Sequence, residues 1–192
     1  MMNQLPLILL CTLLALAVWN DLRTRRIPNL LVFPGALAGL ALNAALPAGA
    51  GLFIAPHGAI GLLWALAGMA LGLLLLLPMY MLRALGAGDV KLMAMLGAFV
   101  GPLAIAGIVV LTLLAGGVLA LLVAVGSGRL LQLLRNTYQI LLHSLLSSVA
   151  GASPRLVEPA SASGRLPYAV AIAAGAAPYL VVGAVSGRNL FA

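Results

Sequence analysis

The chain has 192 residues, of which 64% are hydrophobic and 7% are charged. This composition excludes a soluble globular domain, because so short a chain cannot wrap several apolar runs as long as a bilayer is thick. The formal net charge is +7, but the basic residues lie mostly at the ends of apolar runs and form no stripe that would track phosphates, so we expect no nucleic-acid partner.

Apolar segments recur along the chain at about the length that a bilayer crossing requires. The run over 89–125 is too long for one crossing, and Gly101-Pro102 is the natural place to break it. The sequence therefore predicts an all-α, polytopic bundle of about six transmembrane helices in the lipid bilayer. The predicted spans are 5–20, 30–46, 59–82, about 88–101, 103–125 and about 167–186.

The first span has no Lys or Arg before it, although a secretory signal would normally carry a positive charge there. We therefore expect a retained first helix. A cleavable signal ending near Ala15-Leu16-Ala17 is the alternative.

Residues 126–166 differ from the rest, because polar side chains recur at helical spacing among leucines. This pattern favours an amphipathic helix in the membrane interface over a further transmembrane span. Residues 151–166, with Pro, Ser and Ala, are predicted to be a flexible cytoplasmic loop. We expect both segments to belong to one membrane-embedded domain comprising residues 1–192. The polar side chains of the helix are Arg129, Gln132, Arg135, Asn136, Gln139, His143 and Ser147.

The basic residues predict the orientation of the bundle. If the loop at 20–29 is cytoplasmic, all of them except Arg188 lie on the cytoplasmic side, as the positive-inside rule requires. Both termini then lie outside, and Asp21 and Asp89 share the cytoplasmic face. The basic residues on that face are Arg23, Arg25, Arg26, Arg83, Lys91, Arg129, Arg135, Arg155 and Arg165.

Only three residues are acidic, and two of them, Asp21 and Asp89, lie at the edges of apolar runs. Ionisable residues at a membrane span are costly, so they are functional candidates by default. The alternatives are local: Asp21 pairs with Arg23 or Arg25, and Asp89 is the N-cap of a helix beginning at Val90. The common face favours a shared function, whereas the third acid, Glu158, is expected to be solvated.

Two carboxyls that approach closely cannot both ionise cheaply, so they share one proton. The ionised carboxyl can take a proton from water while the protonated one donates to a carbonyl oxygen, which is aspartic-protease chemistry. Gly86 and Gly88 remove side-chain bulk, so that an extended backbone can approach Asp89. Lys91 can hold Asp89 ionised, orient it, or anchor the helix end at the interface.

The chain offers few ligands for a metal. Cys11 is the only cysteine and lies in an apolar run, so it is expected to pack as a small hydrophobe, and it cannot form a disulfide within the chain. His57 and His143 are isolated in sequence. We therefore expect neither a metal nor a cofactor.

Three pairs of glycines are spaced four residues apart within predicted spans. This spacing is typical of helices whose backbones approach closely in lipid, although chance is the alternative for any one pair in a chain with 22 glycines. The pairs are Gly35/Gly39, Gly68/Gly72 and Gly97/Gly101.

Three segments of the chain resemble segments of the type IV prepilin peptidases, and they occur in the same order. Residues 21–29 (DLRTRRIPN) resemble the segment of the first aspartate in that family. Residues 86–91 (GAGDVK) resemble its GxGD segment, and residues 166–172 (LPYAVAI) resemble the start of its last helix. GxGD alone is shared with presenilin-like and signal-peptide-peptidase-like proteases, so the specificity comes from the three segments together.

The resemblance implies an aspartic endopeptidase of the bacterial cytoplasmic (inner) membrane, with Asp21 and Asp89 as its catalytic pair. Such enzymes remove the short basic leader from prepilins or pseudopilins at the cytoplasmic face, and they serve pilus or type II secretion assembly machinery. The apolar helix after the leader is expected to pack laterally between spans, with 126–166 covering the site. The implied supporting residues, for which helix initiation and packing are the alternative, are Pro28, Asn29, Pro167 and Tyr168.

The long members of that family carry an N-terminal region with paired cysteines, and they methylate the new terminus. This chain has one cysteine and its first aspartate at position 21, so it resembles the short, peptidase-only members that serve tight-adherence pili. Methyl transfer is therefore not expected. Two other functions are a proton-coupled transporter, which predicts aspartates in mid-span, and a structural membrane subunit, which would tolerate loss of either charge.

Overall fold

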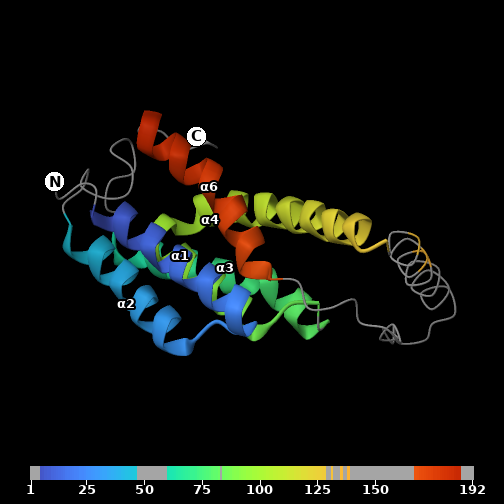
Figure 1. Cartoon of the computed structure of the whole chain (residues 1–192). Coiled ribbons are helices and arrows are strands. Elements are labelled where there is room, and N and C mark those ends of the chain that lie inside the picture. The colour runs from blue at the N-terminus through green and yellow to red at the C-terminus, as the bar shows by residue number, and fades with distance from the viewer. Residues whose placement is uncertain are drawn as a thin grey trace, which may run out of the picture. The chain divides into compact units, whose positions relative to one another are not determined.

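The computed structural model describes residues 5–46, 60–82, 84–128 and 167–186, together with Leu131, Arg135 and Tyr138. These residues form helices and short connections with no strand among them, which confirms the predicted all-α class. The helices are α1 (Leu5–Thr24), α2 (Asn29–Ala45), α3 (Leu62–Met81), α4 (Ala87–Gly126) and α6 (Tyr168–Ser186) (Figure 1).

The described helices have the length and surface of membrane helices. α1, α3 and α4 are long and apolar enough to cross a bilayer, and α2 and α6 are shorter apolar helices. Large side chains such as Leu30 and Leu63 are 86% and 81% exposed. Such a surface is unfavourable in water and neutral against lipid tails. The chain is therefore a membrane protein, while the count of six spans stays a prediction.

Two compact units divide the chain, one formed by 1–116 with 167–192 and the other by 117–166. In the second unit the structure describes the end of α4 and three further helical residues, Leu131, Arg135 and Tyr138. The rest of the predicted interfacial helix, and the loop at 151–166, lie outside the described residues. Both segments, and the single domain that would include them, therefore remain predictions.

The first half of α4 forms the core of the first unit. Every residue from Leu92 to Gly101 is buried, which is the pattern of a helix enclosed on all sides. Around it, α2 contacts both α1 and α3, and α1 contacts α6. The N-terminal turn of α4, which carries Asp89, is less buried, and Gly88 in this turn contacts Ile27 of the connection between α1 and α2.

The three glycine pairs lie where helices approach most closely. A Cβ at Gly68 would lie 2.6 Å from the Cα of Gly101, and one at Gly72 would lie 2.6 Å from the Met93 carbonyl oxygen. The pair on α2 instead makes room for α4 side chains, with Gly35 against the Met95 sulfur and Gly39 against the Phe99 ring. The spacing therefore reflects packing between backbones on α3 and α4 and packing of side chains on α2, rather than chance.

α4 reverses direction at Gly101, as the sequence predicted. Gly101 has φ 81° and ψ 177°, and Pro102 follows it. A Cβ at Gly72 would touch both the Met93 carbonyl carbon at 3.1 Å and Ile105 Cγ1 at 3.2 Å. In a continuous helix those two residues would be about 18 Å apart, so the part of α4 that follows Pro102 in the first unit must return alongside the first half (Figure 1).

Asn43 of α2 compensates for the hydrogen bonds that this reversal removes. Pro102 has no N–H, so the carbonyl of Ala98 loses its helical donor. The Asn43 Nδ2 group donates to the Ala98 oxygen at 2.9 Å and to the Phe99 oxygen at 3.2 Å. Its Oδ1 accepts from the Ile60 N–H at 3.3 Å, so the buried amide is satisfied on both sides.

One helix boundary differs in a way that matters for the site. The first span was predicted to end at residue 20, but α1 continues to Thr24, so Asp21 lies inside its last turn. Apolarity ends at the membrane surface, whereas helical hydrogen bonds continue into the interface. The helix stops where Arg25 adopts φ 54° and donates its N–H to the Asp21 carbonyl at 2.9 Å.

We expect Gly68→Ala to lower the free energy of unfolding by about 1–3 kcal/mol, because the new methyl would overlap α4 backbone. Gly117→Ala is the matched control, since a Cβ there has nothing within 4 Å and alanine favours a helix by up to about 1 kcal/mol. Thermal unfolding of the detergent-purified variants measures both. An unchanged midpoint for Gly68→Ala would contradict the packing described.

Candidate active site

Asp21 lies on the face of α1 that packs into the bundle. The buried residues of this helix include Leu10, Leu14 and Ala17, spaced three or four apart, and Asp21 continues the same series. Its side chain is only 6% exposed. A polar group buried to this extent requires a hydrogen-bond partner.

The first turn of α6 supplies that partner. The backbone N–H of Ala169 donates to Asp21 Oδ2 at 3.1 Å. The first N–H groups of a helix lack acceptors within the helix, and the positive end of the helix dipole favours a carboxylate. Asp21 therefore fixes the start of α6 against α1. Of its two predicted local partners, Arg23 instead lies over the Trp19 ring, 4.2 Å from the centroid.

Asp89 lies in the first turn of α4, and the prediction that it is the N-cap of a helix beginning at Val90 is wrong. The helix begins at Ala87, so Asp89 is its third residue. Its Oδ2 accepts the Gly86 N–H at 3.0 Å, and its own N–H donates to the Gly86 carbonyl at 3.1 Å. This reciprocal pair is the carboxylate half of a capping box and holds the Asp89 side chain over the helix N-terminus.

The structure brings together the helix ends that carry these two carboxyls and Tyr168. Asp21 accepts the N–H of Ala169, the residue after Tyr168, and Gly88, the residue before Asp89, packs against Ile27 in the connection that follows α1. The three residues come from α1, α4 and α6, and 68 sequence positions separate the two aspartates. Helix termini therefore meet at this point, and each contributes one ionisable side chain.

The glycines of the GAGD segment have separate local roles. A Cβ at Gly88 would lie 3.1 Å from the Ile27 Cβ, so the connection between α1 and α2 occupies the space beside it. A Cβ at Gly86 would lie 3.1 Å from Asp89 Oδ2, and Gly86 itself is exposed. An extended substrate backbone could therefore approach Asp89 beside Gly86, whereas Ile27 occupies the space beside Gly88.

Lys91 links the first turns of α4 and α2. Its Nζ donates to Asn29 Oδ1 at 3.1 Å and lies 5.4 Å from the centroid of the Phe33 ring. Pro28 is the residue before α2, and its carbonyl accepts the Leu31 N–H at 3.1 Å. These contacts connect α4 to α2 two residues after Asp89, and the three roles predicted for Lys91 remain predictions.

Tyr168 and Pro167 form the start of α6. Tyr168 is half-buried, and its ring packs on Gly116, where a Cβ would lie 2.9 Å from Cε2. The Pro167 carbonyl accepts the Val170 N–H at 3.2 Å, as expected of a residue that initiates a helix. The ring position thus depends on a glycine in the returning half of α4.

Two contributors to the site were not predicted from the sequence. The Ala169 N–H is a backbone donor without a side-chain signal, although Pro167 before an apolar run marks a helix start whose first amides are free. Ile27 is apolar, so its sequence position does not mark it as a site residue. The one signal is that its neighbour, Gly88, has no side chain.

The arrangement supports acid–base chemistry by carboxyls. Two neighbouring carboxyls can hold one proton between them, and one then acts as base while the other acts as acid. Within the described ranges, no group of three or more His, Cys, Asp or Glu residues is placed to hold a metal ion.

Comparison with known proteins identifies a family. Residues 8–125 match the family model described as the type IV leader peptidase family, a range that includes Asp21, Asp89 and most of the two helices that carry them. No curated protein and no solved structure matches the chain.

We expect Asp21→Leu to lower the free energy of unfolding by about 1–3 kcal/mol, because the buried Ala169 N–H would lose its acceptor. Asp21→Asn is the matched control, since its amide oxygen can still accept that hydrogen bond. Thermal unfolding in detergent compares the two variants. A leucine variant as stable as the asparagine variant would show that this hydrogen bond does not hold α6.

Proposed function

The chain belongs to the type IV leader peptidase family, and on that premise we propose that it is an aspartic endopeptidase that removes the basic leader from prepilins or pseudopilins. The observation that carries the proposal is the meeting of the helix ends that carry Asp21 and Asp89, where the Ala169 N–H binds Asp21 and Gly88 packs against Ile27. The family match covers both aspartates, and no metal is required for the reaction.

In the proposed reaction the ionised carboxyl takes a proton from a water molecule, whose oxygen attacks the carbonyl carbon of the scissile peptide. The protonated carboxyl donates its proton to the carbonyl oxygen. When the tetrahedral intermediate collapses, the C–N bond breaks and the leaving nitrogen takes a proton from the carboxyl that received it from water. One hydroxyl of the intermediate returns its proton to the other carboxyl. The products are a carboxylic acid and an amine, and the aspartate pair again holds one proton.

In this proposal, the substrate is cut at the cytoplasmic face of the bacterial inner membrane. The basic residues Arg23, Arg25 and Arg26 directly follow Asp21, which supports a cytoplasmic location for this end of α1. The positive-inside rule then places Asp89 on the cytoplasmic side as well. Pilus or type II secretion assembly proteins would receive the trimmed product.

The transporter alternative lacks a supporting observation. A proton pathway across the membrane would use carboxyls in mid-span. Asp21 lies in the last turn of α1 and Asp89 in the first turn of α4, so both lie at helix ends. These positions favour chemistry at the membrane surface.

We expect Asp21→Asn and Asp89→Asn each to lower kcat for prepilin cleavage by about 10²–10⁴-fold or more, because neither amide can act as acid or base. Cleavage is measured by the gel shift of a prepilin in membranes that contain each variant. Glu158→Gln is the control, since it removes the third acidic residue and should leave the rate unchanged.

The thermal midpoint of each purified variant separates loss of chemistry from loss of fold. A folded Asp21→Asn or Asp89→Asn protein that cuts at the wild-type rate would overturn the catalytic pair, and with it the proposed mechanism.

We expect Lys91→Met and Asn29→Ala each to lower kcat by about tenfold with little change in KM, because both remove the contact that orients the first turn of α4. The kcat of the double variant should be no lower than the kcat of the more severe single variant. The measurement is a double-mutant cycle on prepilin cleavage. Losses that multiply would show that the two residues act independently.

A further inference from the structure

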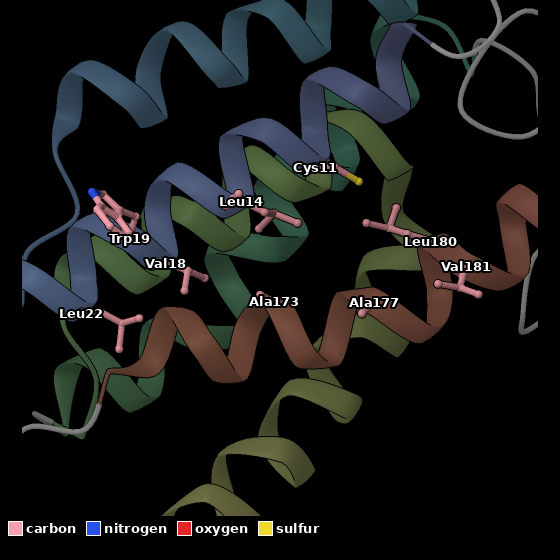
Figure 2. A pocket seen from close by; sticks show the side chains of 10 residues that line it. Cys11, Leu14, Val18, Trp19, Leu22, Ala173, Ala177, Leu180 and Val181 are labelled. Carbon is pink, nitrogen blue, oxygen red and sulfur yellow. The ribbon is translucent and has the colours of Figure 1, made fainter.

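An apolar groove of about 450 Å³ runs between α1 and α6 (Figure 2). It lies on the opposite side of α1 from α2, and Figure 2 shows Val18 and Leu22 on the side of α1 that faces α6. Apart from the Cys11 thiol and the Trp19 indole, its lining is aliphatic. The residues that line it are Cys11, Leu14, Ala15, Val18, Trp19 and Leu22 of α1, and Ala173, Ala177, Leu180 and Val181 of α6.

The shape of the groove suits a helix. On the α6 side Ala173 and Ala177 are four residues apart, and small side chains at that spacing let another helix approach closely in lipid. On the α1 side the lining extends from Cys11 to Leu22, which is about 16 Å along the helix axis. That length corresponds to about three helical turns, or one leaflet of the bilayer.

One end of the groove lies at the candidate active site. Leu22 directly follows Asp21, and Ala173 lies one turn after Ala169, whose N–H binds the Asp21 carboxylate. Cys11 and Val181 mark the other end, within the membrane. The groove therefore leads along the two helices whose ends are joined at Asp21.

We propose that this groove seats the first three turns of the apolar helix that follows the scissile bond of the substrate. The inference rests on the proposed function. A membrane-embedded substrate whose scissile bond reaches Asp21 and Asp89 must place its apolar segment alongside the enzyme, and this groove is continuous with that site. Its aliphatic lining complements an apolar helix and offers nothing to the basic leader, which lies on the other side of the scissile bond.

The geometry also sets the register of the bound helix. Cys11 lies ten residues before Asp21 on α1, which is about 15 Å along the axis. If the substrate helix follows the groove, the residue beside Cys11 is about ten positions after the scissile bond.

Cys11 is exposed and is the only cysteine of the chain, so it can report the register directly. Single cysteines are placed along the apolar segment of a prepilin that the wild type cuts, and disulfide formation is measured with the Asp89→Asn enzyme, which retains uncut substrate. We expect the yield to peak about ten positions after the scissile bond and to repeat every three or four residues.

A thiol at the same depth but outside the groove provides the control. Thr12 is exposed and does not line the groove, so in Cys11→Ala/Thr12→Cys the thiol turns by about 100° around α1 and the yield should fall at least about tenfold. Equal yields from both positions, or no disulfide from Cys11 with a substrate that the wild type cuts, would overturn the proposal and leave lipid as the occupant.

Filling the groove tests the same inference by kinetics. Ala177→Trp should raise KM for the prepilin at least about tenfold with little change in kcat, because it removes binding and not chemistry. Ala174→Trp is the matched control, since Ala174 is exposed on α6 and does not line the groove. A folded Ala177→Trp enzyme with the wild-type KM would overturn the proposal that the groove binds the substrate helix. A wild type that cuts no prepilin would instead overturn the proposed function.

Discussion

The hydrogen bond from the Ala169 N–H to the Asp21 carboxylate holds the site together. It joins the last turn of α1 to the first turn of α6, across 148 residues of sequence, and it satisfies a carboxylate that is nearly buried. The donor belongs to a helix N-terminus, whose N–H groups lack acceptors within the helix, so the contact satisfies both partners. The position of Tyr168, the residue before Ala169, and the position of the groove between α1 and α6 both depend on where this bond places α6.

The second constraint is the reversal of α4 at Gly101. It lets one continuous apolar segment provide a buried central helix, which begins with Asp89, and a returning helix, on which Tyr168 packs at Gly116. Glycines make this possible because they remove side chains where backbones meet, and Asn43 supplies donors for the carbonyls that the break leaves free. The helix that carries Asp89 is thus positioned by backbone packing.

Much of this arrangement could be predicted from the sequence. Asp21 and Asp89 were identifiable because charge is rare and costly in an apolar chain, and the break at Gly101-Pro102 because one helix cannot be that long in a bilayer. The end of α1 was missed, since hydropathy reports the membrane edge and not where hydrogen bonding stops. The Ala169 donor and the Lys91–Asn29 contact could not be predicted, because a backbone amide has no side-chain signal and the second pair lies 62 residues apart.

The most direct test of the account is whether Asp21 and Asp89 lie side by side in the membrane. Asp21→Cys and Asp89→Cys are combined in a Cys11→Ala background, and the pair is treated in native membranes with the shortest bifunctional thiol reagent. The account predicts an intramolecular crosslink for the pair, and none when either cysteine is present alone. If both thiols react with a monofunctional reagent but do not crosslink, the two carboxyls do not form one site, and the shared chemistry is contradicted.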